Sequence, residues 1–288
     1  MTGDPAPAYR PIFRLGGSYA EQAGDFLAGR RPVVEPRDAA SVLLLRAAAG
    51  QPGTEVYMLR RARSMKFAPG ASAFPGGSVD PRDAEDEVAW AGPDAAAWGE
   101  LLEAPPSLAR ALVCAAVRET FEESGVLLAG PAAGTLVADT SGADWEADRT
   151  ALLDRSLSLA QLLARRGLVL RSDLLRPWAR WITPVTEARR YDTRFFAAAL
   201  PPGQRTRDVG GEAEQVAWTR PADALQAARE RELFLLPPTT ACLAGLARYP
   251  DVTAALGAGH SMRPVTPAVV QVDGAFWLTV PSDVEYPQ

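Results

Sequence analysis

The segment AVRETFEESGV, residues 116–126, places three carboxylates on one face of a short stretch of helix. Glu119, Glu122 and Glu123 stand at spacings that make them neighbours on the surface of an α-helix. Like charges in this arrangement oppose helix formation by about 0.2–0.5 kcal/mol per pair. The fold must therefore bring something to this face that offsets the repulsion.

The amino-acid composition limits which other side chains can do chemistry. His260 is the only histidine and Lys66 the only lysine among 288 residues. One histidine excludes His-based catalytic triads and histidine-rich metal sites, so carboxylates are left as the acid, base and metal-binding groups. Cys114 and Cys242 lack the spacing of a metal site, and we expect both to be buried as small apolar residues.

Charge and hydropathy define the class of protein. With 47% hydrophobic and 23% charged residues, we expect a soluble globular protein of one large or two small domains. Its net charge of −5 argues against general binding of nucleic acids, which attract basic surfaces. The sequence has neither an apolar run of about 18 residues nor a signal-peptide pattern, so we predict a cytoplasmic protein without a membrane span.

Local patterns in the first part of the chain predict a hairpin and a glycine-rich loop. Apolar and β-branched runs at 41–47 and 54–62 flank a Gly/Pro turn, and the loop FAPGASAFPGG follows at 67–77. Residues 83–103 have a helical pattern that is broken at Gly92 and Pro93.

The glutamates belong to a helix that we expect to run over residues 108–124. Ser107 is the predicted N-cap, and Gly125 is a natural C-terminal stop. Helical spacing predicts a single buried stripe on this helix, formed by Leu108, Leu112, Ala116 and either Phe121 or Thr120.

The remaining chain predicts a helical block and then alternating strands and helices. Residues 143–175 are mostly helical in pattern. Strands are predicted at 178–184, 190–200 and 214–219, helices from Pro221 and over 239–249, and a hairpin at 268–280 that turns at Asp273 and Gly274. This irregular order of strands and helices favours an α/β sandwich with long helical insertions.

Three glutamates on a helix, preceded by a glycine-rich loop, form a cluster of hard oxygen ligands suited to Mg²⁺ or Mn²⁺. A divalent cation would offset the repulsion noted above. The alternative is a solvated acidic face. The pattern RExxEExG specifies five residues, and chance produces it at on the order of 10⁻⁶ per position, which makes coincidence a poor explanation.

This pattern resembles the Nudix hydrolases, whose box reads G-x5-E-x7-R-E-apolar-x-E-E-x-G-apolar. The second half of the box is matched by Arg118, Glu119, Glu122, Glu123, Gly125 and Val126, with Thr120 at the apolar position. The first half is not contiguous, because Ala104 and Arg110 stand where the first glycine and glutamate are expected. Gly77 of FPGG is the alternative start, with Asp83 near the glutamate position, which implies an insertion of 27 residues, about 84–110.

An insertion at this place is similar to the coenzyme A diphosphatase branch of the family, and the resemblance extends over about residues 40–247. The coenzyme A signature of related enzymes reads LLTxRSxxxRxxxGxxxFPGG. It is matched by Arg61, Gly70, Phe74, Pro75, Gly76 and Gly77, whereas Ala62 and Lys66 replace its serine and its second arginine. The resemblance implies a Nudix α/β/α sandwich with a mixed sheet, helical insertions and a C-terminal extension. We divide the chain into an N-terminal extension (1–39), a Nudix domain (40–236) and a C-terminal extension (237–288).

The resemblance also implies the roles of individual residues. The metal ligands are Glu119, Glu122, Glu123 and the carbonyl of Gly77, and Arg118 fixes a glutamate by an ion pair with Asp83 on its other side. A base or extra ligand is expected from the loop before Trp218, where Glu212 is preferred to Glu214. Four cations precede the glycine loop, namely Arg60, Arg61, Arg63 and Lys66. Of these we expect Arg61 and Lys66 to bind substrate phosphates, together with Gly70 and Gly76.

The implied reaction is attack of water on a phosphorus of coenzyme A or acyl-coenzyme A, giving 3′,5′-ADP and (acyl-)phosphopantetheine. Alternatives are another nucleoside diphosphate derivative such as NADH or ADP-ribose, a noncatalytic Nudix-fold nucleotide sensor, or a scaffold with structural glutamates. Aromatic residues of the predicted strands, Trp178, Trp181, Tyr191, Phe195 and Phe196, are expected in the core rather than in a substrate platform. The 143–175 helices either line an acyl groove or form a homodimer contact.

Overall fold

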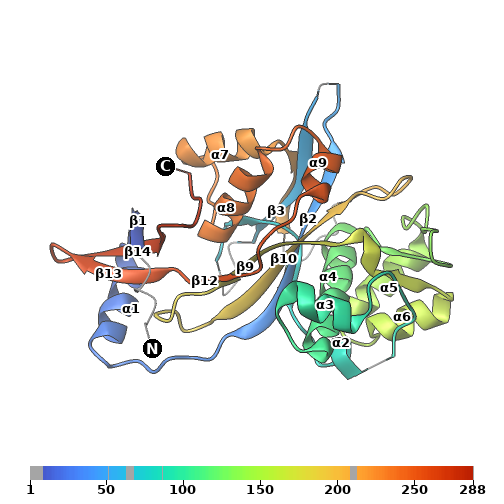
Figure 1. The fold of residues 1–288 in the computed structure, drawn as a ribbon, viewed down its shortest axis with the longest axis horizontal. Helices are drawn as coiled ribbons and strands as arrows, with labels where there is room; N and C mark the ends of the chain where they lie inside the picture. Colours follow the sequence, from blue (N-terminus) through green and yellow to red (C-terminus); the bar gives the residue numbers. More distant parts are fainter. Residues whose placement is uncertain (1–8, 51, 63–67, 86, 208–212, 288) are drawn as a thin grey trace.

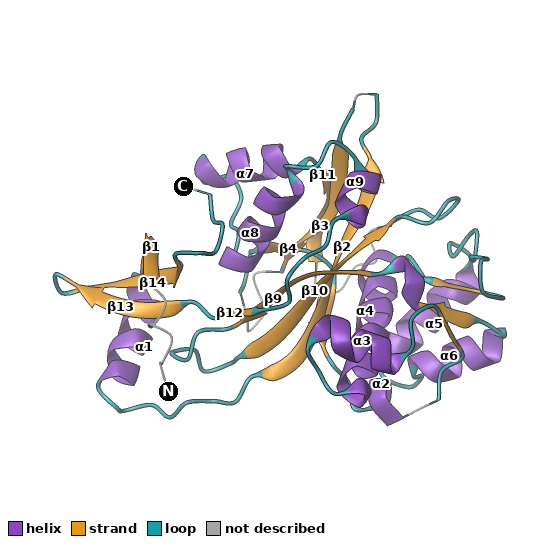
Figure 2. Cartoon of the chain, viewed as in Figure 1, coloured by secondary structure: helices purple, strands orange, loops and turns teal. Residues whose placement is uncertain are grey.

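The fold is built on one mixed β-sheet with helices on both faces (Figures 1 and 2). The computed structural model describes residues 9–50, 52–62, 68–85, 87–207 and 213–287. Within them the main sheet has eight strands in the order β11-β3-β2-β10-β9-β12, with β4 beside β3 and β5 beside β2. Strands β10 and β2 are parallel, whereas β2 and β3 form the predicted antiparallel hairpin.

The strands of the main sheet are β2 (Arg37–Ala47), β3 (Thr54–Arg61), β4 (Ser72–Ala73), β5 (Gly76–Ser78), β9 (Arg176–Ile182), β10 (Tyr191–Ala199), β11 (Ala213–Thr219) and β12 (Pro264–Val265). Two smaller sheets contain β6 (Trp90–Ala91), β7 (Ala129–Gly130) and β8 (Val169–Arg171), and β1 (Tyr9–Arg14), β13 (Ala268–Val272) and β14 (Ala275–Pro281). The helices are α1 (Gly17–Leu27), α2 (Arg82–Glu85), α3 (Ala95–Leu102), α4 (Pro106–Ser124), α5 (Ala143–Leu153), α6 (Leu159–Arg166), the 3₁₀ helix η1 (Ser172–Leu174), α7 (Pro221–Arg229), α8 (Pro237–Leu246) and α9 (Val252–Gly257).

Strand β2 shows why both faces of the sheet are covered. Its run SVLLL is buried throughout, and alternate side chains enter two different cores. Val42 and Leu44 pack on the side of α4, whereas Leu43 and Leu45 pack with α7 and α8. A strand that is apolar on both faces needs cover on both, which is the pattern expected for a sheet in an α/β fold. The predicted α/β class is confirmed.

Helix α4 carries the three glutamates and differs in two ways from its prediction. It begins at Pro106, with Pro105 rather than Ser107 at the N-cap position. Proline is suited to the first helical position because its fixed φ matches the helix and its missing N–H would have no partner there. The predicted single buried stripe is also wrong, because every side chain from Ala111 to Arg118 is buried.

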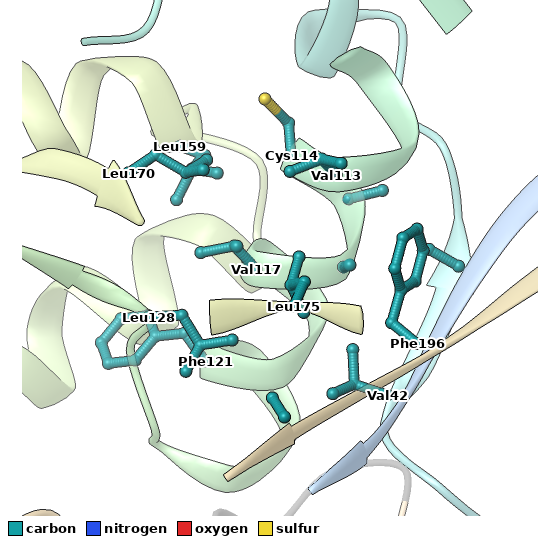
Figure 3. Packing of buried hydrophobic residues seen from close by; sticks show 14 of the residues in the cluster. Val42, Val113, Cys114, Val117, Phe121, Leu128, Leu159, Leu170, Leu175 and Phe196 are labelled. Atoms are coloured by element: carbon teal, nitrogen blue, oxygen red, sulfur yellow. The ribbon is translucent and has the colours of Figure 1, made fainter. Parts of the chain in front are cut away.

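The second buried face of α4 is covered by the helical insertions. Helices α3 and α5 pack against α4, and side chains of α6 belong to the same hydrophobic core. Figure 3 shows α4 side chains such as Val117 between Val42 and Phe196 of the sheet and Leu159 and Leu170 of the insertion. The 143–175 block is mostly helical as predicted, and it closes with β8 and η1.

The N-terminal and C-terminal segments meet in a three-stranded sheet of order β1-β14-β13. The C-terminal hairpin turns at Asp273 (φ 50°) and Gly274 (φ 76°), as predicted. Strand β1 and helix α1 were not anticipated, and α9 is an additional short helix. Figure 1 shows this small sheet and α1 at the end of the molecule away from α3 to α6. No described helix combines the length and apolarity that a bilayer crossing needs.

Candidate active site

The three glutamates of α4 lie against the glycine bend that forms β5. The backbone N–H of Gly76 donates a hydrogen bond of 2.7 Å to Oε2 of Glu123. Strand β5 is itself held by pairing with Ala39 to Ser41 of β2. The sheet therefore fixes the bend, and the bend fixes one carboxylate.

Two consecutive glycines are required because the backbone passes very close to its neighbours. A Cβ at Gly76 would lie 2.7 Å from Cα of Ser41. A Cβ at Gly77 would lie 2.7 Å from Cδ of Glu119. Both distances are shorter than real Cβ contacts allow. The FPGG segment and the helix are therefore complementary surfaces, although 41 positions separate Gly77 from Arg118 in the chain.

Arg118 links the two halves of the interrupted sequence pattern. Its Nε and Nη2 donate hydrogen bonds of 3.0 and 2.9 Å to Asp83, and Nη2 also donates to the carbonyl of Ser78. Its Nη1 donates to Glu119 at 2.8 Å and to Glu122 at 3.3 Å. The ion pairs predicted for this arginine with Asp83 and with a glutamate are present. The guanidinium is 9% exposed, so these contacts are formed away from water.

Burial dominates the electrostatics of the charged groups in the site. Burial raises the pKa of Glu119 to about 7, although Arg118 opposes the shift, and Glu122 adds to it. Burial also raises the pKa of Glu122, again against the charge of Arg118. Burial disfavours the charged form of Arg118, but Glu119 and Asp83 outweigh it and raise the pKa of the guanidinium. The single guanidinium of Arg118 therefore favours the ionised forms of both Glu119 and Glu122, against the effect of burial.

The donor set fits a hard divalent cation by its chemistry, because it consists of carboxylate oxygens with a net negative charge. Gly77, with no side chain, lets its backbone approach Glu119 closely. Within the described residues, no group of three or more acidic, cysteine or histidine side chains is arranged around a common metal position. The reason lies in the contacts: Arg118 stands between Glu119 and Glu122, and Glu123 is directed at Gly76. In this structure Arg118 is the counter-cation of the cluster.

The last turn of α4 is held by groups from two other segments. Arg149 of α5 is 4% exposed and donates from Nη1 to the carbonyl of Glu122 at 3.0 Å. The carbonyl of Gly125 accepts from the hydroxyl of Thr140 at 2.6 Å and from Nη1 of Arg207 at 3.4 Å. Cationic donors at a helix C-terminus satisfy its unpaired carbonyls and favour its dipole. The helical insertion thus braces the helix turn that carries the glutamates.

A second ion-pair cluster lies beside the carboxylates. Asp80 accepts hydrogen bonds from the side chain of Arg82, which lower its pKa well below the ordinary range. Arg82 also donates to the carbonyls of Arg155 and Leu157 in the insertion. These contacts join the segment after the glycine bend to the α5–α6 block.

The carboxylates open into a cleft of about 1430 Å³. The lining includes Gly76, Gly77, Arg118, Glu119, Glu122 and Glu123, together with Arg61 of β3. In the glycine loop, Ala68 and Pro69 line the cleft, whereas Gly70 turns the backbone with φ 72° and donates its N–H to the carbonyl of Arg61. Arg61 and Gly76 therefore stand beside the carboxylates as candidate substrate contacts.

Three of the predicted charged positions, Arg63, Lys66 and Glu212, lie outside the described residues. Arg60 lies on β3 beside Arg61, and Glu214 lies on β11, where it is exposed. Thr120 occupies the apolar position of the pattern while fully buried, since its hydroxyl donates to the carbonyl of Ala116 at 2.7 Å. That departure from the pattern leaves no unpaired polar group.

The aromatic residues of the strands divide between core and cleft. Phe196 and Trp178 are buried in the cores, as expected. Trp181, Tyr191 and Phe195 also line the cleft. The expectation that all five serve only the core is therefore too simple, because one face of β10 and β9 forms the floor of the cleft.

Sequence reasoning missed Arg149, Arg207 and Asp80. Each acts through a neighbour: two hold backbone carbonyls of α4, and one holds Arg82. Backbone carbonyls leave no signal in the sequence, so such contacts were not predictable. For Arg149, the abundance of arginine in the 143–175 block was the one hint in the sequence.

Comparisons with known proteins identify relatives of this chain. A family model described as the NUDT19 Nudix domain matches residues 94–246. The chain is 30% identical over 313 aligned positions to "Acyl-coenzyme A diphosphatase NUDT19" of Gallus gallus, covering 88% of this chain and 80% of that protein. It is 24% identical to the Xenopus laevis protein of the same name, covering 81% and 72%. The crystal structure of a NUDIX hydrolase from Alicyclobacillus acidocaldarius is 31% identical, with a TM-score of 0.64, and covers 78% of this chain and 97% of that one.

Proposed function

Because this chain belongs to the NUDT19 Nudix hydrolase family, we propose that it cleaves the diphosphate of coenzyme A or acyl-coenzyme A. Water adds to one phosphorus, the bridging P–O bond breaks, and the products are 3′,5′-ADP and (acyl-)phosphopantetheine. The observation that carries this proposal is the contact of Glu119 and Glu123 with the Gly76–Gly77 bend. This contact brings the two parts of the interrupted Nudix box, the glycine bend and the glutamates of α4, together beside a large cleft.

Each residue of the site has its own role in the proposed reaction. Glu119 lines the cleft beside the glycine bend, where its carboxylate can hold a metal or accept a proton from the attacking water. Arg118 holds Glu119 and Glu122 in place and offsets part of their charge. Arg61 contributes a positive charge on the substrate side of the cleft. Glu212 is an additional candidate for a base or ligand.

Nudix hydrolases use divalent metal ions, and we assign the metal site to Glu119, Glu122, Glu123 and the carbonyl of Gly77. Bound Mg²⁺ or Mn²⁺ would polarise the diphosphate and lower the pKa of water. For these carboxylates to turn toward a metal, the Nη1 contacts of Arg118 to Glu119 and Glu122 must lengthen, whereas its contacts to Asp83 on the other side can remain. Asp83 therefore keeps the guanidinium close to the cluster.

Two alternatives make different predictions. Another nucleoside diphosphate derivative, such as NADH or ADP-ribose, would use the same carboxylates and differ only in the rest of the cleft. A noncatalytic nucleotide sensor has no need of these carboxylates, yet the chain carries all three box glutamates. Cleavage of coenzyme A is favoured because the named relatives are acyl-coenzyme A diphosphatases.

The test is phosphorus NMR of the products formed from coenzyme A, acetyl-coenzyme A, NADH and ADP-ribose with added Mg²⁺. We expect 3′,5′-ADP from the first two, and loss of turnover when a chelator removes the metal. Glu122→Gln should lower turnover at least about a hundredfold, because it removes a charged group from the reacting site. Glu100→Gln, an exposed glutamate of α3, is the matched control and should retain activity. Equal turnover of the whole panel would contradict the coenzyme A assignment.

A further inference from the structure

One wall of the cleft beside the carboxylates involves the helical insertion. Helix α5 packs against α4, and the end of α5 borders the cleft. The charge of Arg82 acts on Glu122, so this wall begins close to the carboxylates. A group attached to a diphosphate at the carboxylates can therefore reach it. We call it the insertion wall and define it by the following lining residues: Asp80, Arg82, Leu152, Leu153 and Arg155.

Two arginines beside the carboxylates already use their donors within the protein. Arg118 is surrounded by its carboxylate partners. Arg82 donates from Nε and Nη2 to Asp80, at 3.0 and 2.9 Å. Its Nη1 donates to the carbonyls of Arg155 and Leu157, at 2.9 and 3.3 Å. Both guanidiniums therefore hold the protein together and have little capacity for a ligand.

Arg155 differs from these two arginines in its surroundings. Its side chain is 73% exposed and lines the cleft. Among the described residues its guanidinium has no hydrogen-bond acceptor, since Nε lies 3.8 Å from Oδ2 of Asp80, which is too long for a hydrogen bond. The charge of Asp80 is already matched by Arg82. The insertion wall therefore presents one positive charge to the cleft.

The backbone that carries Arg155 is fixed in a strained turn just after α5. Its φ of 64° lies in the left-handed region, which glycine adopts freely and a long side chain does not. Its N–H donates to the carbonyl of Leu152 at 3.0 Å, and its carbonyl accepts from Arg82. Arg82 therefore positions this turn. An arginine at a position that favours glycine indicates a role for its side chain.

The chemistry of this position suits a phosphate. The planar guanidinium can donate two parallel hydrogen bonds to phosphate oxygens. Arg155 pairs with Asp80 rather than with a carboxylate of α4, so it lies to the side of the proposed diphosphate position. A second phosphate group of the substrate would meet it there. Coenzyme A carries such a group on its ribose, whereas NADH and ADP-ribose do not.

We propose that Arg155 binds the 3′-phosphate of coenzyme A and thereby selects coenzyme A over nucleoside diphosphate derivatives that lack this group. This inference rests on the proposed function. It assigns substrate selection to the 143–175 insertion, which lies outside the box, and gives Arg82 the part of a positioning residue.

The experiment measures kcat/KM for coenzyme A and for 3′-dephospho-coenzyme A with Mg²⁺ present. The unaltered protein should prefer coenzyme A at least about tenfold, because a charge-assisted contact is made only with the 3′-phosphate. Arg155→Met should bring the ratio close to one by lowering the value for coenzyme A alone. Arg165→Met is the matched control: this arginine of the same insertion is 55% exposed and lies outside the cleft lining formed by the described residues. It should leave the ratio unchanged.

A second variant separates substrate binding from folding. Arg155→Gly removes the guanidinium and the backbone strain together. It should lose the preference for coenzyme A as fully as Arg155→Met does, while its melting temperature should not fall below that of Arg155→Met. Retention of the preference in Arg155→Gly would contradict the proposal.

Other results would also overturn the proposal. These are the absence of a preference in the unaltered protein, a changed ratio in Arg165→Met, or an equal loss for both substrates in Arg155→Met, which would place Arg155 at the diphosphate. Failure to cleave either substrate overturns the proposed function instead. Calorimetric binding of 3′,5′-ADP against 5′-AMP then still tests Arg155, and an equal effect of Arg155→Met on the two affinities would reject it.

Discussion

At the scale of single residues, Arg118 explains how α4 tolerates its carboxylates. Its guanidinium contacts Asp83, Glu119 and Glu122 at once and is nearly buried. A buried charge without such partners would be strongly destabilising. Burial raises the pKa of Glu119 although Arg118 opposes the shift, so one guanidinium does not fully offset the cost of burying this carboxylate beside Glu122.

Gly77→Ala is the sharpest single-residue test of the site. The new Cβ would meet the Glu119 carboxylate, so we expect that side chain to move from its position beside Arg118. Activity should fall by about 10- to 100-fold, as found when groups that orient metal ligands are changed. The measurement is kcat/KM for coenzyme A together with the concentration of Mg²⁺ that gives half-maximal rate.

The control for this change is Gly259→Ala, where an added Cβ meets no atom within 4 Å. This variant should retain both the rate and the Mg²⁺ requirement. Full activity of Gly77→Ala would contradict the close packing of the bend on α4.

At the scale of elements, α5 stabilises the C-terminal turn of α4. Its Arg149 reaches the carbonyl of Glu122, and its Glu146 accepts from both Arg149 and Arg207. Helix α5 therefore links two cations that hold the last turn of α4. This gives the 143–175 insertion a definite mechanical role in addition to the core that it shares with α4.

Arg149→Met should weaken this brace while keeping most of the side chain's bulk. We expect a loss of about 1–3 kcal/mol in the free energy of unfolding, because the Glu122 carbonyl loses a buried charged donor. Denaturant unfolding measures this loss, and kcat should fall with it. Arg165→Met in α6 is the control, since Arg165 is mostly exposed and its partner Asp148 keeps a second contact with Arg166. Equal stability of the two variants would argue against the brace.

Elements with local signals were predictable from the sequence. The β2–β3 hairpin follows apolar runs around a Gly/Pro turn, and α4 stops at Gly125, whose φ of 73° suits glycine. Strand β1 was missed because its partner, β14, lies near the opposite end of the sequence, and pairing at that distance leaves no local pattern. The two-sided burial of α4 was missed for the same reason, since it depends on packing by α3, α5 and α6.

Prediction of the candidate site succeeded where spacing within a helix determines proximity. Glu119, Glu122 and Arg118 meet because they share α4, and the Gly77 bend was placed beside them by family resemblance. The role of Arg118 as counter-cation, with Nη1 between two glutamates, depends on side-chain geometry that spacing does not specify. The end of the cleft lined by Phe13, Tyr19 and Leu278 depends on β1–β14 pairing, which the sequence did not indicate.

At the scale of the whole molecule, the single histidine offers a probe of global stability. His260 stacks on Trp178 with ring centroids 4.0 Å apart, and Trp178 packs in turn against Tyr249. Burial lowers the pKa of His260 below its ordinary value of 6.5. The folded protein therefore resists protonation at this position, whereas the unfolded chain does not.

The contribution of His260 to stability should fall as the pH is lowered through the ordinary histidine pKa, because unfolding then takes up a proton at this ring, whereas the raised pKa of Glu119 acts in the opposite direction. Stability gained from the neutral ring is fully present above that value. The measurement is the free energy of unfolding in denaturant between pH 7.5 and about 5.5 for the unaltered protein and for His260→Gln, and the stability of the unaltered protein relative to the variant should fall as the pH is lowered. An identical slope in both proteins would show that carboxylates alone set the pH dependence.

The pairing of β1 with β14 also bears on how the protein is made. During synthesis the first strand leaves the ribosome long before its partner exists, so Phe13 and Tyr19 have no fixed position until the last hairpin has emerged. The carboxylate centre, built from residues in between, can assemble earlier. A nascent chain therefore builds the carboxylate centre before the end of the cleft that β1 and β14 complete, and a protein released without its final strand would keep its carboxylates but lack that end of the cleft.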